Sequence, residues 1–372
     1  MSQPTATITI NLDALVSNYR ALCSMAASGT CAAVVKADAY GLGVVPVARA
    51  LAAAACREFF VADVNEGVAL RAVLPSADFR IHVFEGVDDA SAEATMAANL
   101  WPVLNSDRQI DCWQRTARRV GRELPCTLHV DTGMNRLGMP AHDALTRAGR
   151  ADGLHGLALQ LLITHLACAD DPANPMNAAQ LRAFGDVTAA FGNIRTSIAN
   201  SGGLMMAPEY HGDLPRPGIA MYGGNPQPGQ DSPFRTVVTM TARVLQTRQV
   251  AAGATVGYGA SYCAPGTRTL ATLAAGYADG YPRALSNRGW VAISGHRAPV
   301  VGRVSMDTTV VDITDLPLAV SAGLDVAELI GTTISLDSVA RWADSINYAV
   351  LTGLGRRPDR RYSLVAEGAA DR

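Results

Sequence analysis

The first 225 residues alternate short, continuously apolar segments with longer stretches whose apolar residues recur at helical spacing. Buried strands between amphipathic helices are typical of a parallel sheet covered on both faces. We expect eight such strands, over residues 31–36, 58–63, 80–86, 100–105, 126–133, 157–165, 194–201 and 216–224. Eight parallel strands close a (β/α)8 barrel of the TIM type. An open doubly wound sheet is the alternative, but no G-x-G-x-x-G motif opens the first unit.

The pattern changes at about residue 236. Strand-like segments separated by glycine or proline follow one another, and helical patterning returns only at residues 336–345. Such a succession is typical of a mostly antiparallel β domain. The segment NPQPGQDSP at residues 225–233 has the composition of a linker. The sequence therefore predicts an α/β barrel domain over residues 1–230 and a C-terminal β domain over residues 231–372.

Charge and hydropathy narrow the range of partners. The 372 residues include 31 basic and 33 acidic side chains, a net charge of −2, and only 17% of the residues are charged. A chain with this balance has no positive field to attract nucleic acid or anionic lipid. No apolar run reaches the ~18 residues of a membrane span, and no basic start followed by an apolar run marks a secretory signal. We expect neither nucleic acid nor a membrane as a partner.

The seven cysteines are odd in number and include no C-x-x-C pair. In a chain of this size they are typical of reduced, mostly buried thiols in a cytoplasmic protein. We expect no disulfide framework and no metal site.

Polar residues follow several of the expected strands at the same end of the barrel, where barrel enzymes carry their catalytic groups. The polar residues are Lys36, Arg136, His165, Ser201 and Arg216, and Gly218 and Ile219 follow Arg216 around the last strand. The loops after the seventh and eighth strands of such barrels commonly bind a phosphate group. A lysine that faces a phosphate site predicts pyridoxal 5′-phosphate, bound covalently through Lys36.

Eight sequence motifs carry more information than any single residue. They are VVKADAYGLG (34–43), DTGMNRLGM (131–139), THLACAD (164–170), ANSGG (199–203), RPGIAMYG (216–223), VGYGASY (256–262), GYADGYPR (276–283) and GRVSMD (302–307). In this order the chain resembles the pyridoxal-phosphate-dependent alanine racemases of fold type III, over about residues 8–362. The resemblance implies a barrel followed by a β domain, and the interconversion of L-alanine and D-alanine.

The resemblance also implies how the cofactor is bound. Lys36 corresponds to the lysine that carries it, and hydroxyl and backbone N–H groups suit its phosphate dianion. The phosphate contacts implied by the resemblance are Tyr40, Ser201, Gly218, Ile219 and Tyr348. Taken alone, a lysine at a strand end would extend its amine toward solvent, and a Ser-Gly-Gly segment would be a turn.

Arg216 corresponds to the family's arginine that faces the pyridine nitrogen of the cofactor. Many enzymes with this cofactor have an acidic residue there. An arginine keeps the nitrogen unprotonated and the ring a weaker electron sink, which suits a racemase. His165 corresponds to the residue that links Arg216 to the second catalytic base. Without the motifs, Arg216 would be a packing residue and His165 a core histidine.

Racemisation removes a proton from one face of Cα and returns one to the other face. Lys36 serves one face, and the resemblance assigns Tyr258 to the other. A free phenol is largely protonated at neutral pH, so the cationic Arg216, acting through His165, would favour the phenolate. In the family the β domain of a second subunit supplies this tyrosine, which implies a homodimer with shared active sites. Alone, VGYGASY would be a glycine-rich turn.

The substrate carboxylate is assigned by the resemblance to Arg136 and to the backbone N–H of Met306. The fork of a guanidinium matches a carboxylate. Tyr277 narrows the pocket to the size of alanine, and Tyr281 and Asp307 lie with it at the entrance. Alone, Arg136 would pair with a nearby acid.

One position departs from the family. A carbamylated lysine that often steadies the arginine is replaced by His129, so we expect a bound anion such as chloride, or another acid, beside Arg136.

Two other activities compete with alanine racemisation. A pyridoxal-phosphate-dependent decarboxylase shares the architecture, but its cysteine-containing acidic C-terminal motif is missing. A racemase of another small amino acid, such as serine, differs by one hydroxyl, which a pocket discriminates weakly. A cofactor-binding barrel without catalysis would lack the β domain. The sequence favours an isomerase that supplies D-alanine for peptidoglycan or serves alanine catabolism.

Overall fold

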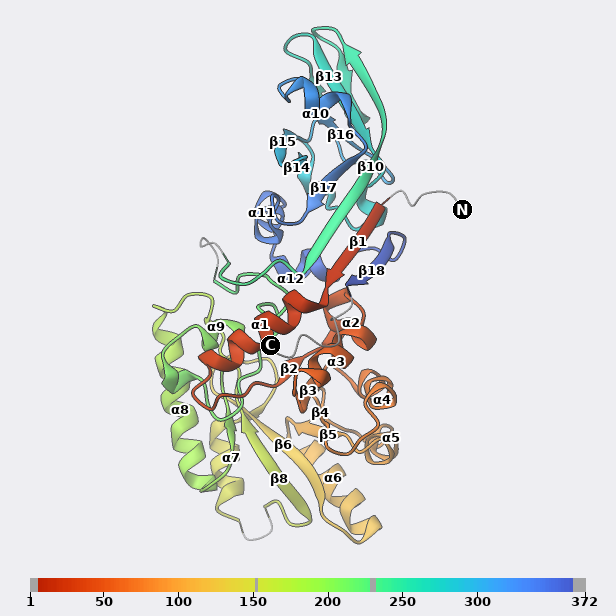
Figure 1. Ribbon diagram of the computed structural model, residues 1–372. Coiled ribbons are helices and arrows are strands. Elements are labelled where there is room, and N and C mark those ends of the chain that lie inside the picture. Colours follow the sequence, from red (N-terminus) through yellow and green to blue (C-terminus); the bar gives the residue numbers. More distant parts are fainter. Residues whose placement is uncertain (1–5, 151–152, 228–231, 364–372) are drawn as a thin grey trace, which may run out of the picture. The chain divides into compact units, whose positions relative to one another are not determined.

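The computed structural model describes residues 6–150, 153–227 and 232–363, which form two compact units (Figure 1). The barrel unit contains residues 16–150, 153–221 and 226–227, and the β unit contains residues 6–15, 222–225 and 232–363. The unit boundary falls within α1 (Leu12–Met25).

The barrel unit is built on a parallel sheet with the strand order β2-β3-β4-β5-β6-β8-β9. Its strands are β2 (Ala33–Val34), β3 (Glu58–Val61), β4 (Arg80–Val83), β5 (Trp101–Leu104), β6 (Leu124–Asp131), β8 (Leu157–Ile163) and β9 (Thr196–Ser197), and β7 (Met139–Pro140) pairs with β6. Seven of the eight expected strands are thus confirmed, in sequential order, as a barrel of the TIM type requires.

The eighth expected strand, residues 216–224, is not a regular strand. Its first residues nevertheless connect the two ends of the sheet, because Arg216 N–H donates to the carbonyl of Ala199 (2.8 Å) and Val34 N–H donates to the carbonyl of Pro217 (3.1 Å). Pro215 and Pro217 have no N–H to donate, so this segment cannot form a regular ladder with both neighbours.

Helices connect the strands, and Figure 1 shows α4, α5, α6 and α8 along the outer side of the sheet. The helices are α2 (Lys36–Gly41), α3 (Val44–Ala53), α4 (Val64–Val73), α5 (Ala92–Ala97), α6 (Asp107–Val120), α7 (Ala141–Ala148), α8 (Pro175–Phe191), α9 (Ser201–Leu204) and the 3₁₀ turn η1 (Pro208–Tyr210).

The local sequence fixes the ends of α6. The Ser106 side chain accepts the N–H of Gln109, and Gly121 ends the helix in the left-handed conformation. Its buried face, with Trp113, packs into the same apolar core as Leu128 of β6 and Phe184 of α8.

The β unit is a mostly antiparallel sheet around β10 (Val238–Val250), which pairs with β1, β13 and β17. The remaining strands are β1 (Ala6–Asn11), β11 (Thr255–Val256), β12 (Tyr262–Cys263), β13 (Arg268–Leu273), β14 (Trp290–Ile293), β15 (His296–Pro299), β16 (Thr309–Asp312), β17 (Val326–Ile330) and β18 (Asp359–Ser363). The helices are η2 (Tyr258–Ala260), η3 (Tyr277–Asp279), η4 (Arg283–Leu285), α10 (Leu318–Ala322), α11 (Leu336–Trp342) and α12 (Asn347–Thr352).

The N-terminal strand β1 belongs to the β unit, whereas the sequence groups residues 1–230 together. It pairs antiparallel with β10, from Ala6 opposite Ala242 to Ile10 opposite Val238. Ile8 and Ile10 point to the same side and are fully buried. The alternation in ATITIN is therefore the burial pattern of a sheet strand.

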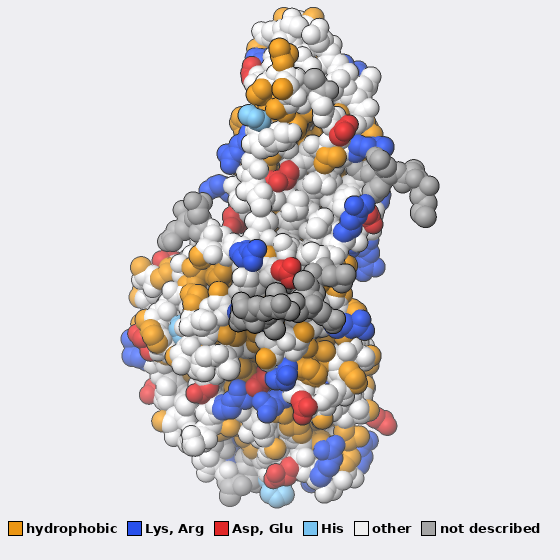
Figure 2. All heavy atoms as spheres, viewed as in Figure 1, with side chains coloured by type: hydrophobic (Ala, Val, Ile, Leu, Met, Phe, Trp, Pro, Cys, Tyr) orange, Lys and Arg blue, Asp and Glu red, His pale blue; other side chains and the backbone are white. Residues whose placement is uncertain are grey.

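The chain has nearly equal numbers of basic and acidic side chains, 31 and 33. On the face shown in Figure 2, acidic, basic and apolar side chains are interspersed. Among the described residues, none of the helices has the length and apolar character needed to cross a bilayer.

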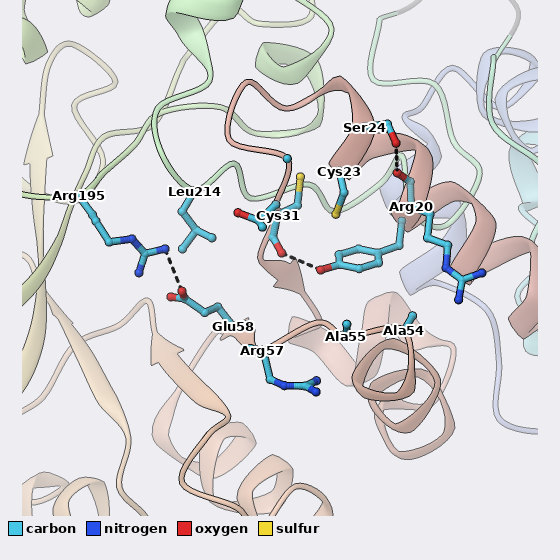
Figure 3. Close-up of a pocket in the computed structure, with 13 residues that line it drawn as sticks. Arg20, Cys23, Ser24, Cys31, Ala54, Ala55, Arg57, Glu58, Arg195 and Leu214 are labelled. Atoms are coloured by element: carbon cyan, nitrogen blue, oxygen red, sulfur yellow. Dashed lines mark hydrogen bonds and ion pairs between the residues drawn. The ribbon is translucent and has the colours of Figure 1, made fainter.

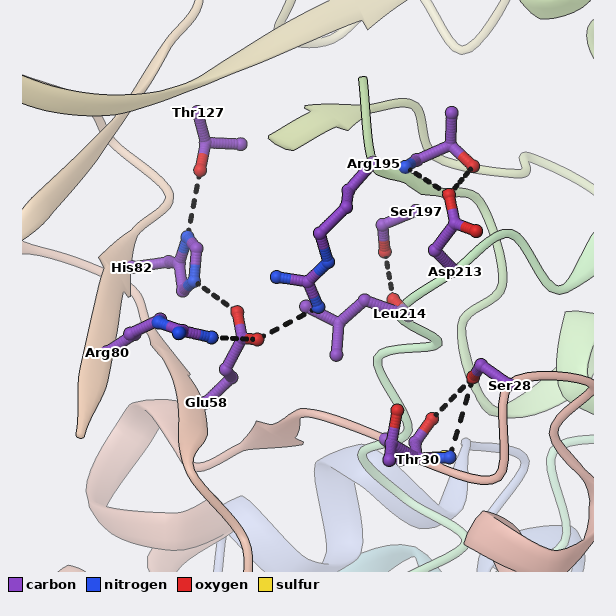
Figure 4. A network of polar contacts seen from close by, with 12 residues as sticks. Ser28, Thr30, Glu58, Arg80, His82, Thr127, Arg195, Ser197, Asp213 and Leu214 are labelled. Carbon is purple, nitrogen blue, oxygen red and sulfur yellow. Dashed lines mark hydrogen bonds and ion pairs between the residues drawn. The ribbon is translucent and has the colours of Figure 1, made fainter. Parts of the chain in front are cut away.

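A buried ion network at the start of β3 stabilises the interior of the barrel (Figure 4). Glu58 Oε1 accepts from Arg80 and Arg195, each at 2.9 Å, and Oε2 lies 3.2 Å from His82 Nε2. Burial lowers the pKa of His82, so its imidazole is neutral. A proton on Nε2 then donates to Glu58, and Nδ1 accepts from the Thr127 hydroxyl at 2.8 Å.

Burial acts to raise the pKa of Glu58, but the hydrogen bond from His82 and the charge of Arg195 outweigh it and lower the pKa from 4.5 to about 2. A carboxyl group whose pKa is lower in the folded protein stabilises the fold above its unfolded pKa. That stabilisation is lost as the pH falls from about 4.5 to about 2.

We expect Glu58→Gln to lower the free energy of unfolding by about 3 kcal/mol at pH 7, because it leaves Arg195 and Arg80 beside a neutral amide. Urea unfolding followed by circular dichroism at pH 7 and pH 3 measures the change, which should be smaller at pH 3. Glu123→Gln, at an exposed glutamate, is the matched control and should change the free energy by less than ~0.5 kcal/mol. An equal loss at both pH values would contradict this account of Glu58.

Candidate active site

Lys36 directly follows β2, at the end of the barrel where the sequence predicts the site. It is half-buried, its Nζ lies 5.6 Å from the ring centre of Phe84, and it is the only lysine in the chain. Burial and the nearby charge of Arg136 lower the pKa of Lys36, and the charge of Glu66 opposes the change. Neutral amine is therefore more abundant than for a solvated lysine, which favours attack on a carbonyl group.

The four residues after Lys36 form a left-handed turn. Ala37, Asp38, Ala39 and Tyr40 have φ between 53° and 58°, a conformation that costs ~1–2 kcal/mol per residue for L-amino acids. Side chains hold this turn in place. Glu66 accepts the N–H of Ala37 at 2.7 Å, and Asp38 accepts that of Val44 at 2.7 Å.

The turn directs Tyr40 toward Gly218. A Cβ atom added at Gly218 would lie 2.1 Å from the Tyr40 hydroxyl oxygen, so any larger residue there would displace the Tyr40 side chain. The Ser201 hydroxyl accepts the N–H of Gly218 at 2.8 Å and that of Ala220 at 3.3 Å. Ile219, between them, is fully buried. The four residues Tyr40, Ser201, Gly218 and Ile219 are therefore brought together, as the sequence predicts.

Arg216 is a buried cation. Its guanidinium donates to the Ser197 hydroxyl and to the Thr164 carbonyl (2.7 Å), and its Nη2 lies 3.5 Å from His165 Nδ1. Among the described residues it has no carboxylate partner. Burial lowers the pKa of Arg216 to about 9, so it remains a cation at neutral pH.

Burial and the charge of Arg216 lower the pKa of His165 well below its usual value. The neutral imidazole accepts from Arg216 at Nδ1, which leaves its proton on Nε2. The contact predicted between Arg216 and His165 is present.

His129 occupies the position of the family's modified lysine. Its Nδ1 lies 2.8 Å from the side-chain oxygen of Asn105. Burial and the charge of Arg216 lower the pKa of His129 to about 4, so it is neutral at pH 7. Arg136 is exposed, and no described carboxylate forms an ion pair with it.

The other candidate residues lie in the β unit. Tyr258 belongs to the turn η2 and is 72% exposed, Tyr277 belongs to η3 and is 42% exposed, and Met306 is 53% exposed. Tyr348 is half-buried in α12. Tyr281 is fully buried in this chain, a position that does not fit the expected entrance.

Two loops of the β unit are joined to each other. The N–H groups of Tyr277 and Ala278 donate to the carbonyls of Ser305 and Met306, each at 3.0 Å. Arg357 forms an ion pair with the buried Asp279 at 2.6 Å and another with Asp307. Tyr277 and Met306 are thereby held as neighbours.

Sequence reasoning missed several supporting residues, namely Glu66, Asn105, Thr164, Ser197 and Arg357. They act through hydrogen bonds or ion pairs to residues distant in sequence, so no local motif marks them. The single lysine is a signal that the sequence does contain: Lys36 is the only side-chain amine that could bind an aldehyde cofactor.

Comparison with known proteins gives one result along the whole chain. The family models for the alanine racemase N-terminal and C-terminal domains match residues 10–226 and 237–362. The biosynthetic and the catabolic alanine racemases of Agrobacterium fabrum are 43% and 44% identical to it, over 97% and 95% of this chain and 94% and 91% of their own.

Among solved structures, the alanine racemase of Bartonella henselae with covalently bound pyridoxal phosphate has a TM-score of 0.90 and 38% sequence identity, over 97% of this chain and 100% of that chain. These similarities do not favour a decarboxylase or a racemase of another amino acid. With both domain models matched and more than 40% identity over nearly the full length, this chain belongs to the alanine racemase family.

Proposed function

We propose that this protein interconverts L-alanine and D-alanine with pyridoxal 5′-phosphate bound through Lys36, using Lys36 and the Tyr258 of a partner subunit as the two bases. The observation that carries the proposal is the buried Arg216, which has no described carboxylate partner and lies on the same barrel rim as the only lysine. An acidic residue at this position would suit enzymes that need a stronger electron sink.

The residues present fit the cofactor. Tyr40, Ser201, Gly218 and Ile219 converge where a Cβ atom at Gly218 would collide with the Tyr40 hydroxyl, and such a cradle of hydroxyl and N–H groups suits a phosphate. We assign these four residues and Tyr348 to the phosphate. When bound, pyridoxal phosphate acidifies the Cα–H bond of an attached amino acid.

Lys36 acts at one face of Cα. Its lowered pKa leaves an amine that can bind the cofactor and, once released from it, take up or return a proton at Nζ. Tyr258 acts at the opposite face through its phenolic oxygen. The exposure of Tyr258, Tyr277 and Met306 on the β unit supports a homodimer in which a partner subunit covers them, because active sites exclude bulk water.

Arg216 and His165 would set the protonation state of the cofactor's pyridine ring and of the phenol of the partner's Tyr258. Arg216 is the residue that would hold the pyridine nitrogen, and a cation there would keep that nitrogen unprotonated. Neutral His165 carries its proton on Nε2 and can donate it to the phenolate oxygen of the partner's Tyr258. In this way the charge of Arg216 favours the basic form of the phenol.

The substrate carboxylate is assigned to the Arg136 guanidinium and the Met306 N–H, with Tyr277 narrowing the pocket beside the side chain. Since His129 is neutral and no described acid pairs with Arg136, a bound anion such as chloride would be its partner in the resting enzyme.

The cell's use of the product is either D-alanine for peptidoglycan or alanine catabolism, and the nearly equal identity to both Agrobacterium enzymes favours neither. All seven cysteines are free, which supports a reducing compartment such as the cytoplasm.

The first experiment incubates the protein with L-alanine and pyridoxal phosphate in D₂O. We expect D-alanine with deuterium at Cα, measured by chiral chromatography and mass spectrometry. Lys36→Ala should lower the rate by ~10³-fold or more and abolish borohydride trapping of the cofactor. The double variant Lys36→Ala, Arg49→Lys restores one lysine at an exposed position and should trap none. Release of CO₂, or turnover of serine but not alanine, would overturn the proposal.

Tyr258→Phe should separate proton exchange from inversion. With only Lys36 left as a base, one enantiomer should still exchange its Cα–H for deuterium with retention, while racemisation is lost. Proton NMR of L-alanine and of D-alanine in D₂O measures the two exchange rates. Equal loss of exchange from both enantiomers would contradict separate bases for the two faces.

Mixed dimers test whether the active sites are shared. Half of the dimers formed from refolded equal amounts of Lys36→Ala and Tyr258→Phe chains would be hybrids, each with one intact site, so activity should return to about a quarter of the wild-type value. Each variant refolded alone is the control. No recovery from the mixture, with hybrid dimers verified by native mass spectrometry, would place both bases in one chain.

A further inference from the structure

A cavity lies at the end of the barrel unit where the strands begin (Figure 3). It has a volume of about 520 Å³, and its wall includes residues that precede the strands, such as Cys31 before β2 and Arg195 before β9. The active-site residues follow the strands instead. The cavity is therefore separate from the site described above, and nothing in the proposed reaction uses it.

Two cysteines line this cavity, Cys23 from α1 and Cys31 from the segment that leads into β2. The chain turns back between them, since Gly29 N–H donates to the Ala26 carbonyl at 2.9 Å and the Tyr19 hydroxyl donates to the Cys31 carbonyl at 2.9 Å. Both side chains therefore lie on the wall of one cavity. Figure 3 shows their sulfur atoms next to each other at the cavity wall.

The two thiols differ in acidity. The interaction with Cys31 lowers the pKa of Cys23 to about 7, although burial opposes the change. The same contact with Cys23, together with burial, raises the pKa of Cys31. One thiol is thus half-buried and about half ionised at pH 7, and its neighbour keeps its proton. This combination is typical of an attacking thiolate beside a resolving thiol.

We propose that Cys23 and Cys31 are a redox-active pair that reacts with hydroperoxides and closes to an intramolecular disulfide at this cavity. The cavity admits a small oxidant, and both thiols lie on its wall, within the same turn of the chain.

The reaction balances in two steps. The Cys23 thiolate attacks one oxygen of hydrogen peroxide, an S–O bond forms, the O–O bond breaks, and the departing hydroxide takes up a proton to become water. The Cys31 sulfur then attacks the Cys23 sulfur, an S–S bond forms, the S–O bond breaks, and the leaving hydroxide carries off the Cys31 proton as water. The two thiols lose two electrons in total, and peroxide gains them.

The other cysteines do not have this arrangement. Cys56, the nearest further thiol, is fully buried and donates to the Glu58 carbonyl at 3.3 Å, and burial raises its pKa to about 12. Cys126 is likewise fully buried, and its pKa is raised to about 12. Cys263 is exposed in the β unit and serves as a control for unselective oxidation.

The test uses the full-length protein with its cofactor. It is treated with hydrogen peroxide, denatured in an alkylating reagent and digested with trypsin, which cuts after Arg20 and Lys36 and so releases both cysteines in the peptide 21–36. We expect this peptide to lose two hydrogen atoms and both alkylation sites, and dithiothreitol to restore them. Alkylation counts thiols only, so oxidation of Met25 in the same peptide does not interfere.

Two variants sharpen the result. Cys31→Ser should stop the reaction at the first step, so that dimedone labels Cys23 as a sulfenic acid, and Cys263→Ser should leave disulfide formation unchanged. The wild-type measurement needs no variant, so poor folding of Cys31→Ser does not remove the test. The proposal is overturned if peptide 21–36 keeps both alkylatable thiols while Cys263 is oxidised. It is also overturned if Cys23 is linked instead to Cys56, in peptide 50–57, or to another molecule.

Discussion

The buried charge of Arg216 is the constraint on which the rest of the site depends. A cation removed from water without a carboxylate partner is costly unless its donors are satisfied. Thr164, Ser197 and His165 supply these acceptors, and they fix the ends of β8 and β9. The same segment connects the sheet back to β2 through Pro217. Burial and this charge together keep His165 and His129 neutral, so Arg216 contributes both to the closure of the barrel and to the protonation state of its rim.

A second cost is backbone strain next to Lys36. Four successive left-handed residues would cost several kcal/mol in a free peptide at ~1–2 kcal/mol each, and they persist because Glu66 and Asp38 accept N–H groups that the turn leaves without strand partners. Strain of this kind is found where geometry matters more than stability. Here it places the Tyr40 hydroxyl against Gly218, four residues after the only lysine.

The sequence predicts those features that follow from local patterns. Apolar runs locate seven strands of the barrel, and the rim residues follow from where those strands end. The eighth segment is not predicted correctly, because Pro215 and Pro217 have no N–H groups to donate. Isolated backbone hydrogen bonds therefore take the place of a regular strand ladder. The sequence pattern does not predict the pairing of β1 with β10, because the paired residues are more than 200 positions apart. The turn after Lys36 depends on Glu66, 30 positions further along, and ADAY alone contains no glycine to indicate positive φ.

His129 gives the substrate a part in setting the basicity of Lys36. Where the family often has a modified, anionic lysine, this chain has a neutral imidazole bound to Asn105, so the charge of Arg136 is not offset from that side. That charge contributes to the lowered pKa of Lys36. A carboxylate bound at Arg136 would neutralise it, and the amine would become a stronger base once the site is filled. An anion at Arg136, whether chloride in the resting enzyme or the substrate carboxylate, would therefore make Lys36 a better proton acceptor than in the anion-free protein.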